Sequence, residues 1–163
     1  GKPHYAEYFK KCFEILDDNG LMLLHSIGRW DAPAATNAWV WKYIFPGGYT
    51  PTLSEITPII EKAGFIIADI EVLRIHYAET LKRWRERFLA HRNEVLKLFD
   101  ERFIRMWEFY LAGFEPSFSY DGLNVFQIQL IKKNSIDTPP ITRNYMYPGS
   151  EESVRARMMT AAE

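Results

Sequence analysis

The stretch that decides the fold runs from Ile66 to Leu111 and reads IIADIEVLRIHYAETLKRWRERFLAHRNEVLKLFDERFIRMWEFYL. Its beginning is rich in β-branched residues and partly alternates between apolar and polar, which predicts a mostly buried strand over residues 65–73. After a turn at residues 74–77, the apolar residues from Tyr77 onward recur at helical spacing. The stretch therefore predicts a strand followed by a helical excursion.

A single helix over the whole excursion would be unusually long for a globular domain. We therefore expect a break at residues 91–93, with Asn93 as the N-cap of a second helix. The excursion also carries many basic residues between its aromatic ones. Such a face suits lipid headgroups or an acidic partner, and it equally suits the solvated side of a core helix.

The composition of the 163-residue chain indicates one domain with a tail. Twenty basic residues against 21 acidic ones exclude the basic character of a nucleic-acid-binding domain. The aromatic content of 15% favours a large apolar pocket or interface, or a core built of large side chains. Cys12 is the single cysteine, which agrees with the cytoplasm, and no apolar run is long enough to span a membrane.

The residues before the deciding stretch predict a helix, a strand and a second helix. Apolar spacing predicts the helix over residues 5–16, and a continuous apolar run predicts a strand covered on both faces over 21–27. Residues 27–51 form a loop-rich insertion that includes a short helix at 37–44. A capping box at 52–55 then opens the second helix, which Gly64 closes and in which Pro58 predicts a later start or a bend.

The residues after the deciding stretch close the sheet. We expect a loop over residues 113–122, a final alternating strand over 123–131, and a tail over 134–163 that is ordered only where it docks. The helical excursion then covers residues 76–112. The whole pattern is typical of an α/β domain with three strands.

Two positions stand where open α/β sheets bind ligands, beyond the carboxyl ends of strands. His25 ends the first strand, and His76 and Tyr77 occupy the second strand-to-helix turn. Each site is open to a simpler interpretation, a histidine bonded to a backbone carbonyl or a residue that caps or packs. The sequence shows no metal-ligand spacing, no serine or cysteine nucleophile motif and no glycine-rich nucleotide loop.

Four motifs, in order between residues 5 and 133, resemble the C-terminal part of cyclopropane-fatty-acyl-phospholipid synthases, which include the mycolic-acid cyclopropane synthases. They are LLHSIG at 23–28, YIFPGG at 43–48, HYAETL at 76–81 with Trp84, and ERFIRMW at 101–107 with Tyr110 and Leu111. The resemblance implies the C-terminal half of a class I methyltransferase (Rossmann-like) fold, with the last strand antiparallel between the other two.

The same resemblance implies an activity and a set of site residues. The family transfers a methylene from S-adenosylmethionine to the double bond of an unsaturated phospholipid acyl chain, through a carbocation, with bicarbonate as the base. By resemblance, the bicarbonate site comprises His25, Tyr77 and the backbone of Ile27. The wall of the acyl pocket comprises Phe45, Tyr49, Thr50 and Leu81, of which Thr50 is more polar than its family counterpart.

The resemblance also implies that the family's cofactor site precedes this sequence. On that basis we expect a C-terminal fragment that is inactive alone, located in the cytoplasm and peripheral to the membrane. Its expected partners are a phospholipid acyl chain or membrane surface, and a second copy or the missing N-terminal half, but no nucleic acid. The alternatives are a lipid-binding or oligomerising module without catalysis, or a non-functional remnant.

Overall fold

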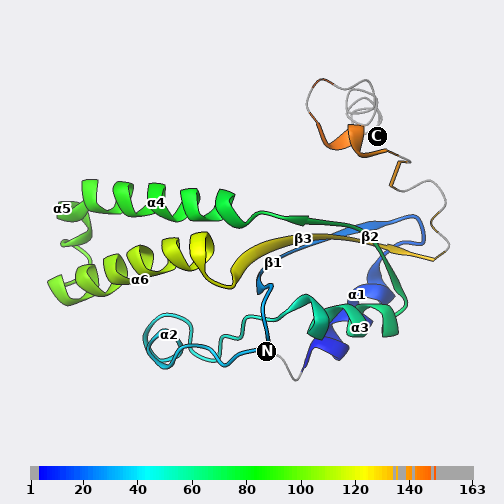
Figure 1. Ribbon diagram of the computed structural model, residues 1–163, viewed down its shortest axis with the longest axis horizontal. Helices are drawn as coiled ribbons and strands as arrows, with labels where there is room; N and C mark the ends of the chain where they lie inside the picture. The colour runs from blue at the N-terminus through cyan, green and yellow to red at the C-terminus, as the bar shows by residue number, and fades with distance from the viewer. Residues whose placement is uncertain (1–3, 134, 136–138, 141, 148, 150–163) are drawn as a thin grey trace.

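The computed structural model describes residues 4–133, 135, 139–140, 142–147 and 149. A three-stranded sheet lies at its centre, and a pair of long helices projects from one end of that sheet (Figure 1). The elements follow the chain as α1 (Tyr5–Ile15), β1 (Leu21–Arg29), α2 (Ala38–Tyr43), α3 (Leu53–Lys62), β2 (Phe65–Val72), α4 (Arg74–Ala90), α5 (Arg92–Val95), α6 (Glu101–Tyr120), β3 (Leu123–Lys132) and the 3-10 helix η2 (Arg143–Met146).

The sheet has the strand order β1-β3-β2, and β3 is antiparallel to both neighbours. This confirms the predicted topology, in which the last strand lies between the other two. Pairing runs from Leu21 opposite Ile131 to Arg29 opposite Leu123, with a bulge in β2 between Ile67 and Asp69. Because residues directly opposite each other share a face, this register assigns each side chain to one face of the sheet.

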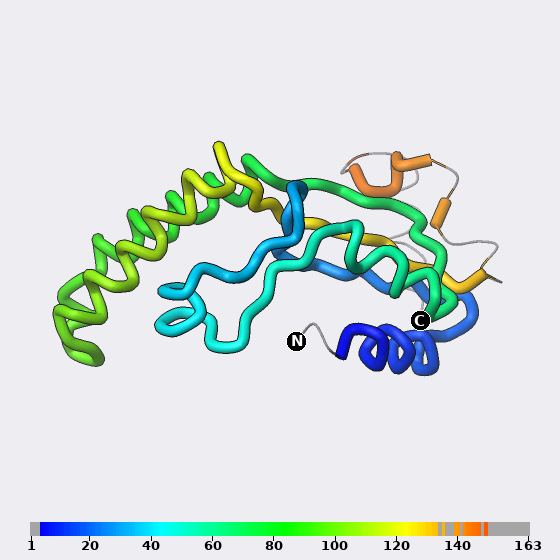
Figure 2. Tube along the Cα trace, turned by 60° about the horizontal axis from the view of Figure 1, so that its bottom comes forward, coloured from blue at the N-terminus to red at the C-terminus, as the bar shows by residue number. Residues whose placement is uncertain are grey.

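One face of the sheet is closed by α1 and α3. Phe9 and Ile60 pack there against a β3 row that includes Phe126 and Ile128, and each of these side chains is at most 3% exposed. The predicted capping box opens α3 at Thr52, and Gly64 follows the helix with a φ of 101° that glycine adopts without strain. Figure 2 shows α1 and α3 on the same side of the strands.

On the other face, α4 and α6 cover only one end, where they pack on Val125 and Leu123. The prediction of a loop over 113–122 is wrong, because α6 continues to Tyr120 with Pro116 inside it. The Arg74 side chain donates hydrogen bonds to the carbonyl oxygens of Phe118 and Ser119, which the end of the helix leaves without backbone partners. This cap explains why the helix extends past Gly113 and Pro116.

Other predictions on the excursion need correction. Its helices span residues 74–120 rather than 76–112, since α4 begins directly at Arg74. The break after Ala90 is confirmed, but Asn93 lies inside the one-turn helix α5 and caps nothing. Asp100 is the N-cap of α6, because its carboxylate accepts a hydrogen bond from the Phe103 N–H at 2.8 Å.

Two expectations, on the coverage of β1 and on the start of α3, also differ from the structure. The second face of β1 is covered only at Ile27, which packs on the α4–α6 cluster, since Leu21 and Leu23 on that face are 38% and 52% exposed. Helix α3 begins at Leu53, five residues before Pro58, so a later start is wrong.

The described part of the tail docks on the partly open face. Arg143 in η2 forms a bidentate ion pair with Asp69 of β2, and the Tyr145 hydroxyl donates to Gln129 of β3 at 2.6 Å. Figure 2 shows η2 on the side of the sheet opposite α1 and α3. The remaining residues of the predicted tail lie outside the described part of the chain.

Candidate functional site

A cavity of about 1020 Å³ lies between the end of β1, the 34–50 loop and α6. Most residues that the sequence analysis proposed for a site line this one cavity: His25, Ile27, Phe45, Tyr49, Thr50 and Tyr77. Leu81 does not line the cavity. Its side chain is fully buried in the α4–α6 cluster, which also contains the cavity-lining Tyr110. The structure thus gathers residues that lie up to 52 positions apart in the chain.

The outer edge of β1 carries a backbone donor at Ile27, a residue that lines the cavity. The Arg29 N–H bonds to the Pro51 carbonyl at 2.8 Å, across the edge of β1 that β3 does not occupy. Since backbone groups two residues apart in a strand point the same way, the Ile27 N–H points toward that same edge. The Ile27 carbonyl accepts the Ser26 hydroxyl at 2.9 Å.

Tyr77 supplies a phenol from the first turns of α4. Its ring packs against Phe118 and Trp84, with centroid distances of 4.8 and 6.1 Å. Burial raises the pKa of Tyr77 above its ordinary value, so at neutral pH the phenol is a protonated hydrogen-bond donor. This position, one turn into the helix, follows from the direct passage of β2 into α4.

His25 projects from β1 beside Gln127 of β3. The two residues are directly opposite in register, and Nε2 of Gln127 lies 3.3 Å from Nδ1 of His25. The histidine is exposed and lines the cavity, while the glutamine is half-buried. Two side-chain groups, a phenol and an imidazole, therefore border the cavity from different elements.

Aromatic rings form the rest of the wall. Asn37 caps α2 and places Trp39 edge-on against Phe109 of α6, with centroids 5.0 Å apart. Phe45 meets Tyr110 in the same way at 5.7 Å. Burial, and then the neighbouring Tyr77, raise the pKa of Tyr110 to about 12, so this hydroxyl is also uncharged at neutral pH. The wall is mainly apolar, and the Arg29 side chain that also borders it is paired with Asp31.

Sequence reasoning missed the contribution of α6 to this wall. The side chains of Phe109, Tyr110, Phe114 and Ser117 line the cavity, together with Gly113. The predicted loop over 113–122 hid them, although Tyr110, Phe114 and Phe118 continue the four-residue spacing of a helix. That spacing was the available signal. Gln127 was missed as well, because only the strand register brings it to His25.

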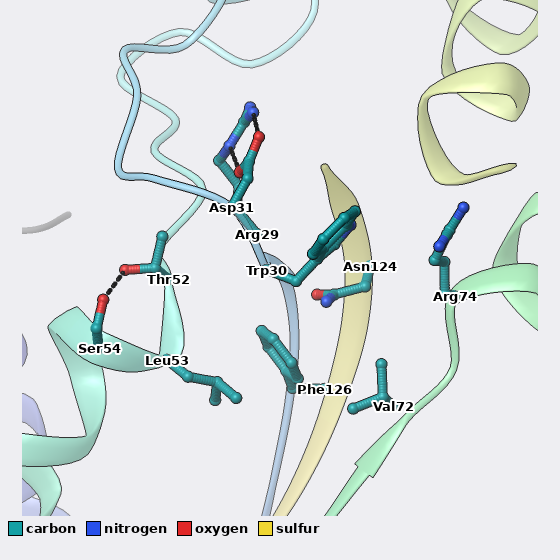
Figure 3. A pocket seen from close by; sticks show the side chains of 10 residues that line it. All are labelled: Arg29, Trp30, Asp31, Thr52, Leu53, Ser54, Val72, Arg74, Asn124 and Phe126. Carbon is teal, nitrogen blue, oxygen red and sulfur yellow. Dashed lines mark hydrogen bonds and ion pairs between the residues drawn. The ribbon is translucent and has the colours of Figure 1, made fainter. Parts of the chain in front are cut away.

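A second cavity, of about 430 Å³, lies on the opposite face of the sheet and contains none of the proposed site residues (Figure 3). Asn124, which lines it, is fully buried, and its side-chain nitrogen and oxygen have no hydrogen-bond partner among the described residues. Arg29 and Asp31 at its rim already pair with each other. The larger cavity, where several candidate donors meet an apolar wall, is therefore the better candidate site.

Within the described ranges, no three side chains of histidine, cysteine, aspartate or glutamate gather as metal ligands would. None of the helices described there combines the length and apolar character needed to cross a bilayer.

Comparison with known proteins gives a family match over most of the chain. Residues 1–128 match the family model described as mycolic acid cyclopropane synthetase. Tuberculostearic acid methyltransferase UfaA1 of Mycobacterium tuberculosis is 40% identical over 82% of this chain and 33% of its own length. The cyclopropane-fatty-acyl-phospholipid synthase of Escherichia coli is 33% identical over 78% of this chain and 33% of its own.

The structural comparison agrees with the sequence comparison. The cyclopropane synthase MmaA2 from Mycobacterium tuberculosis superposes with a TM-score of 0.75 and 28% identity, over 81% of this chain and 51% of that one. The solved structures that share this fold are class I S-adenosylmethionine-dependent methyltransferases, which confirms the predicted fold class. This chain spans about a third of the length of these two relatives and half of that structure.

Proposed function

Because this chain belongs to the mycolic acid cyclopropane synthetase family, we propose that it forms the substrate side of an enzyme that transfers a methylene from S-adenosylmethionine to the double bond of an unsaturated phospholipid acyl chain. The observation that carries the proposal is the single cavity shared by His25, Ile27, Tyr77 and an aromatic wall. Hydrogen-bond donors beside a large apolar space suit a small anion next to a hydrocarbon chain.

His25, Tyr77 and the backbone of Ile27 are proposed to hold bicarbonate, which supplies the base. The residues fit this ion, since the Tyr77 phenol stays protonated and the Ile27 N–H points to the unpaired edge of β1. Both groups donate to an acceptor, and bicarbonate oxygens accept. The imidazole of His25 adds a third donor from its ring nitrogen.

The aromatic wall is proposed to receive the acyl chain. Positive charge that develops on that chain must be kept from water, and electron-rich rings stabilise it at short range. Phe45 and Tyr110 together with Trp39 and Phe109 offer such rings around the cavity. Tyr49 is held in place by hydrogen bonds from its hydroxyl to the Glu55 carboxylate, at 2.7 and 2.9 Å.

The methyl donor has no fitting cradle in the described residues. A glycine-rich turn between a strand and a helix would suit it, yet β2 passes through Leu73 directly into α4, and β1 leads into the loop before α2. We therefore place the S-adenosylmethionine site outside residues 4–133 and expect no turnover from this chain alone.

The partners in this proposal follow from two surfaces. Apart from the contact of Arg29 with the 51–52 segment, the outer edge of β1 has no strand partner in the described ranges, so the remainder of the family's fold, or a second copy, would pair there. At the end of the helical hairpin Leu98 and Phe99 are 78% and 50% exposed, which suits peripheral contact with a membrane surface in the cytoplasm.

Binding of an acyl chain tests the proposal directly. Dibromostearic acid, kept below its micelle concentration, should quench tryptophan fluorescence because Trp39 lines the cavity, and Trp39→Phe should remove most of that quenching. Gly113 lines the cavity and a Cβ there meets nothing within 4 Å, so Gly113→Leu should fill space and weaken binding roughly tenfold or more. Arg102→Leu on the exposed surface of the same helix is the matched control.

Quenching that is equal in Gly113→Leu and Arg102→Leu would contradict the proposed acyl site. Isothermal titration with S-adenosylmethionine checks whether the donor site lies outside residues 4–133. Saturable binding of that donor to this chain would overturn the expectation that the donor site lies elsewhere. Quenching without donor binding is the result that we expect.

A further inference from the structure

We propose that Gln127 is a positioning residue that fixes which ring nitrogen of His25 carries the proton. The inference rests on the proposed function, in that it assigns a purpose to an anion-facing His25, but the hydrogen bond itself is independent of it. Gln127 lies directly across from His25, and its amide nitrogen is 3.3 Å from Nδ1. The amide N–H donates, so Nδ1 must be the unprotonated acceptor.

This contact determines what the rest of the ring can do. A neutral imidazole has one N–H, and when Nδ1 accepts from Gln127 that proton sits on Nε2. The Nε2–H then remains available as a donor to an anion in the cavity that His25 lines. With the opposite tautomer, Nε2 would present a lone pair to the anion and repel it.

The strands make the contact rigid. Gln127 belongs to β3, the central strand, and is paired with β1 on one side and with Glu71 of β2 on the other. Its backbone neighbours Phe126 and Ile128 are buried in the closed face, at 2% and 0% exposure. The amide therefore stands on the best-anchored strand of the molecule, whereas His25 stands on a strand with an open edge. A partner on the central strand therefore holds the His25 ring in one orientation, although β1 has an open edge.

Nitrogen-15 NMR of the imidazole rings tests the proposal on this chain without any turnover. In long-range proton–nitrogen spectra, we expect neutral His25 to show a protonated Nε2 and an unprotonated Nδ1. Gln127→Glu replaces the donor by an acceptor and should reverse the ratio, giving mainly Nδ1–H. Gln127→Leu removes the partner and should give a mixture of the two forms. The His25 signals are assigned from a His25→Asn sample.

Gln129→Glu is the matched control. It makes the same change two residues along β3, on the same face, where Gln129 bonds to Tyr145 rather than to a histidine. We expect this variant to keep the wild-type tautomer. A wild-type ring that is mainly Nδ1–H would overturn the proposal, and so would a tautomer ratio that Gln127→Leu leaves unchanged. If one Gln127 variant does not fold, the other still tests the proposal against the wild type.

Bicarbonate titration into the same samples separates this inference from the proposed function. A shift of the His25 Nε2 signal that persists in Gln129→Glu and weakens in Gln127→Glu supports both. An Nε2–H ring that Gln127 variants alter, but that does not respond to bicarbonate, supports the positioning role and counts against the anion site. A response to bicarbonate with an Nδ1–H ring overturns the positioning role and leaves the anion site intact.

Discussion

On one face of the sheet, α1 and α3 bury a continuous apolar row that includes Phe126 and Ile128. On the other face, α4 and α6 cover only the strand ends, and the middle carries the polar pair His25 and Gln127. The first face provides the stability of the sheet, because apolar burial is the dominant favourable term in folding. The second face gives up part of that burial, and the candidate site lies where its cover begins.

The largest expected effect is a difference in the free energy of unfolding between two truncations to alanine, one on each face. Ile128→Ala on the closed face should cost about 2–5 kcal/mol, because the residue is fully buried and leaves a cavity. Leu23→Ala on the partly open face, where the side chain is 52% exposed, should cost less than about 1 kcal/mol. Urea unfolding followed by circular dichroism measures both. Equal losses would show that the two faces do not differ as the structure indicates.

The closed face could be predicted from sequence, since it depends on local periodicity. The spacing of residues 5–16, the capping box at Thr52 and the alternation of 123–131 each report a local preference, and each element forms as predicted. The open face depends on contacts between distant segments. The cap that Arg74 places on α6 and the pairing of His25 with Gln127 join residues 44 to 102 positions apart, which no local pattern reveals.

The candidate site was predicted only in part, because it too combines local patterns with contacts between distant segments. A general rule on ligand sites in α/β sheets points to residues just beyond strand ends, where Tyr77 stands. The same rule led to His25, but the prediction that His25 ends the first strand is wrong, because β1 continues to Arg29 and His25 lies in its middle. The α6 side of the wall was lost because Gly113 and Pro116 are ordinarily helix breakers. Here Arg74 of α4 caps the end of α6, so a tertiary contact outweighs local propensity.

Alkaline pH should destabilise the cluster under α4 and α6. Tyr110 is 5% exposed and its pKa is raised from 10.0 to about 12, mainly by burial. The folded state therefore holds the phenol proton where the unfolded chain releases it, so this contribution is complete below pH 10 and is lost as the pH rises toward 12. The loss should amount to about 2–3 kcal/mol, measured by urea unfolding across that range.

A phenylalanine in place of Tyr110 should reduce this alkaline loss, because it removes one of the phenols whose pKa burial raises, while Tyr77 remains. Tyr120→Phe is the matched control, since Tyr120 lies on the same helix and is 88% exposed. That control should keep the wild-type decline. If Tyr110→Phe loses as much stability as the wild type between pH 10 and 12, burial of Tyr110 is not what makes this end of the open face sensitive to alkali.

The smallest effect is expected where the tail covers the open face. Asp69→Asn removes the carboxylate that pairs with Arg143 and should release η2, which shows as faster amide hydrogen exchange over residues 142–147. Added salt should act in the same direction on the wild type, because the Arg143 side chain is 62% exposed and screening reaches it. Tyr145→Phe, which loses only the hydroxyl bond to Gln129, should give a weaker version of the same change. The strands should exchange as in the wild type, since α1 and α3 hold them from the other face; faster exchange in β3 would mean that the tail stabilises the sheet itself.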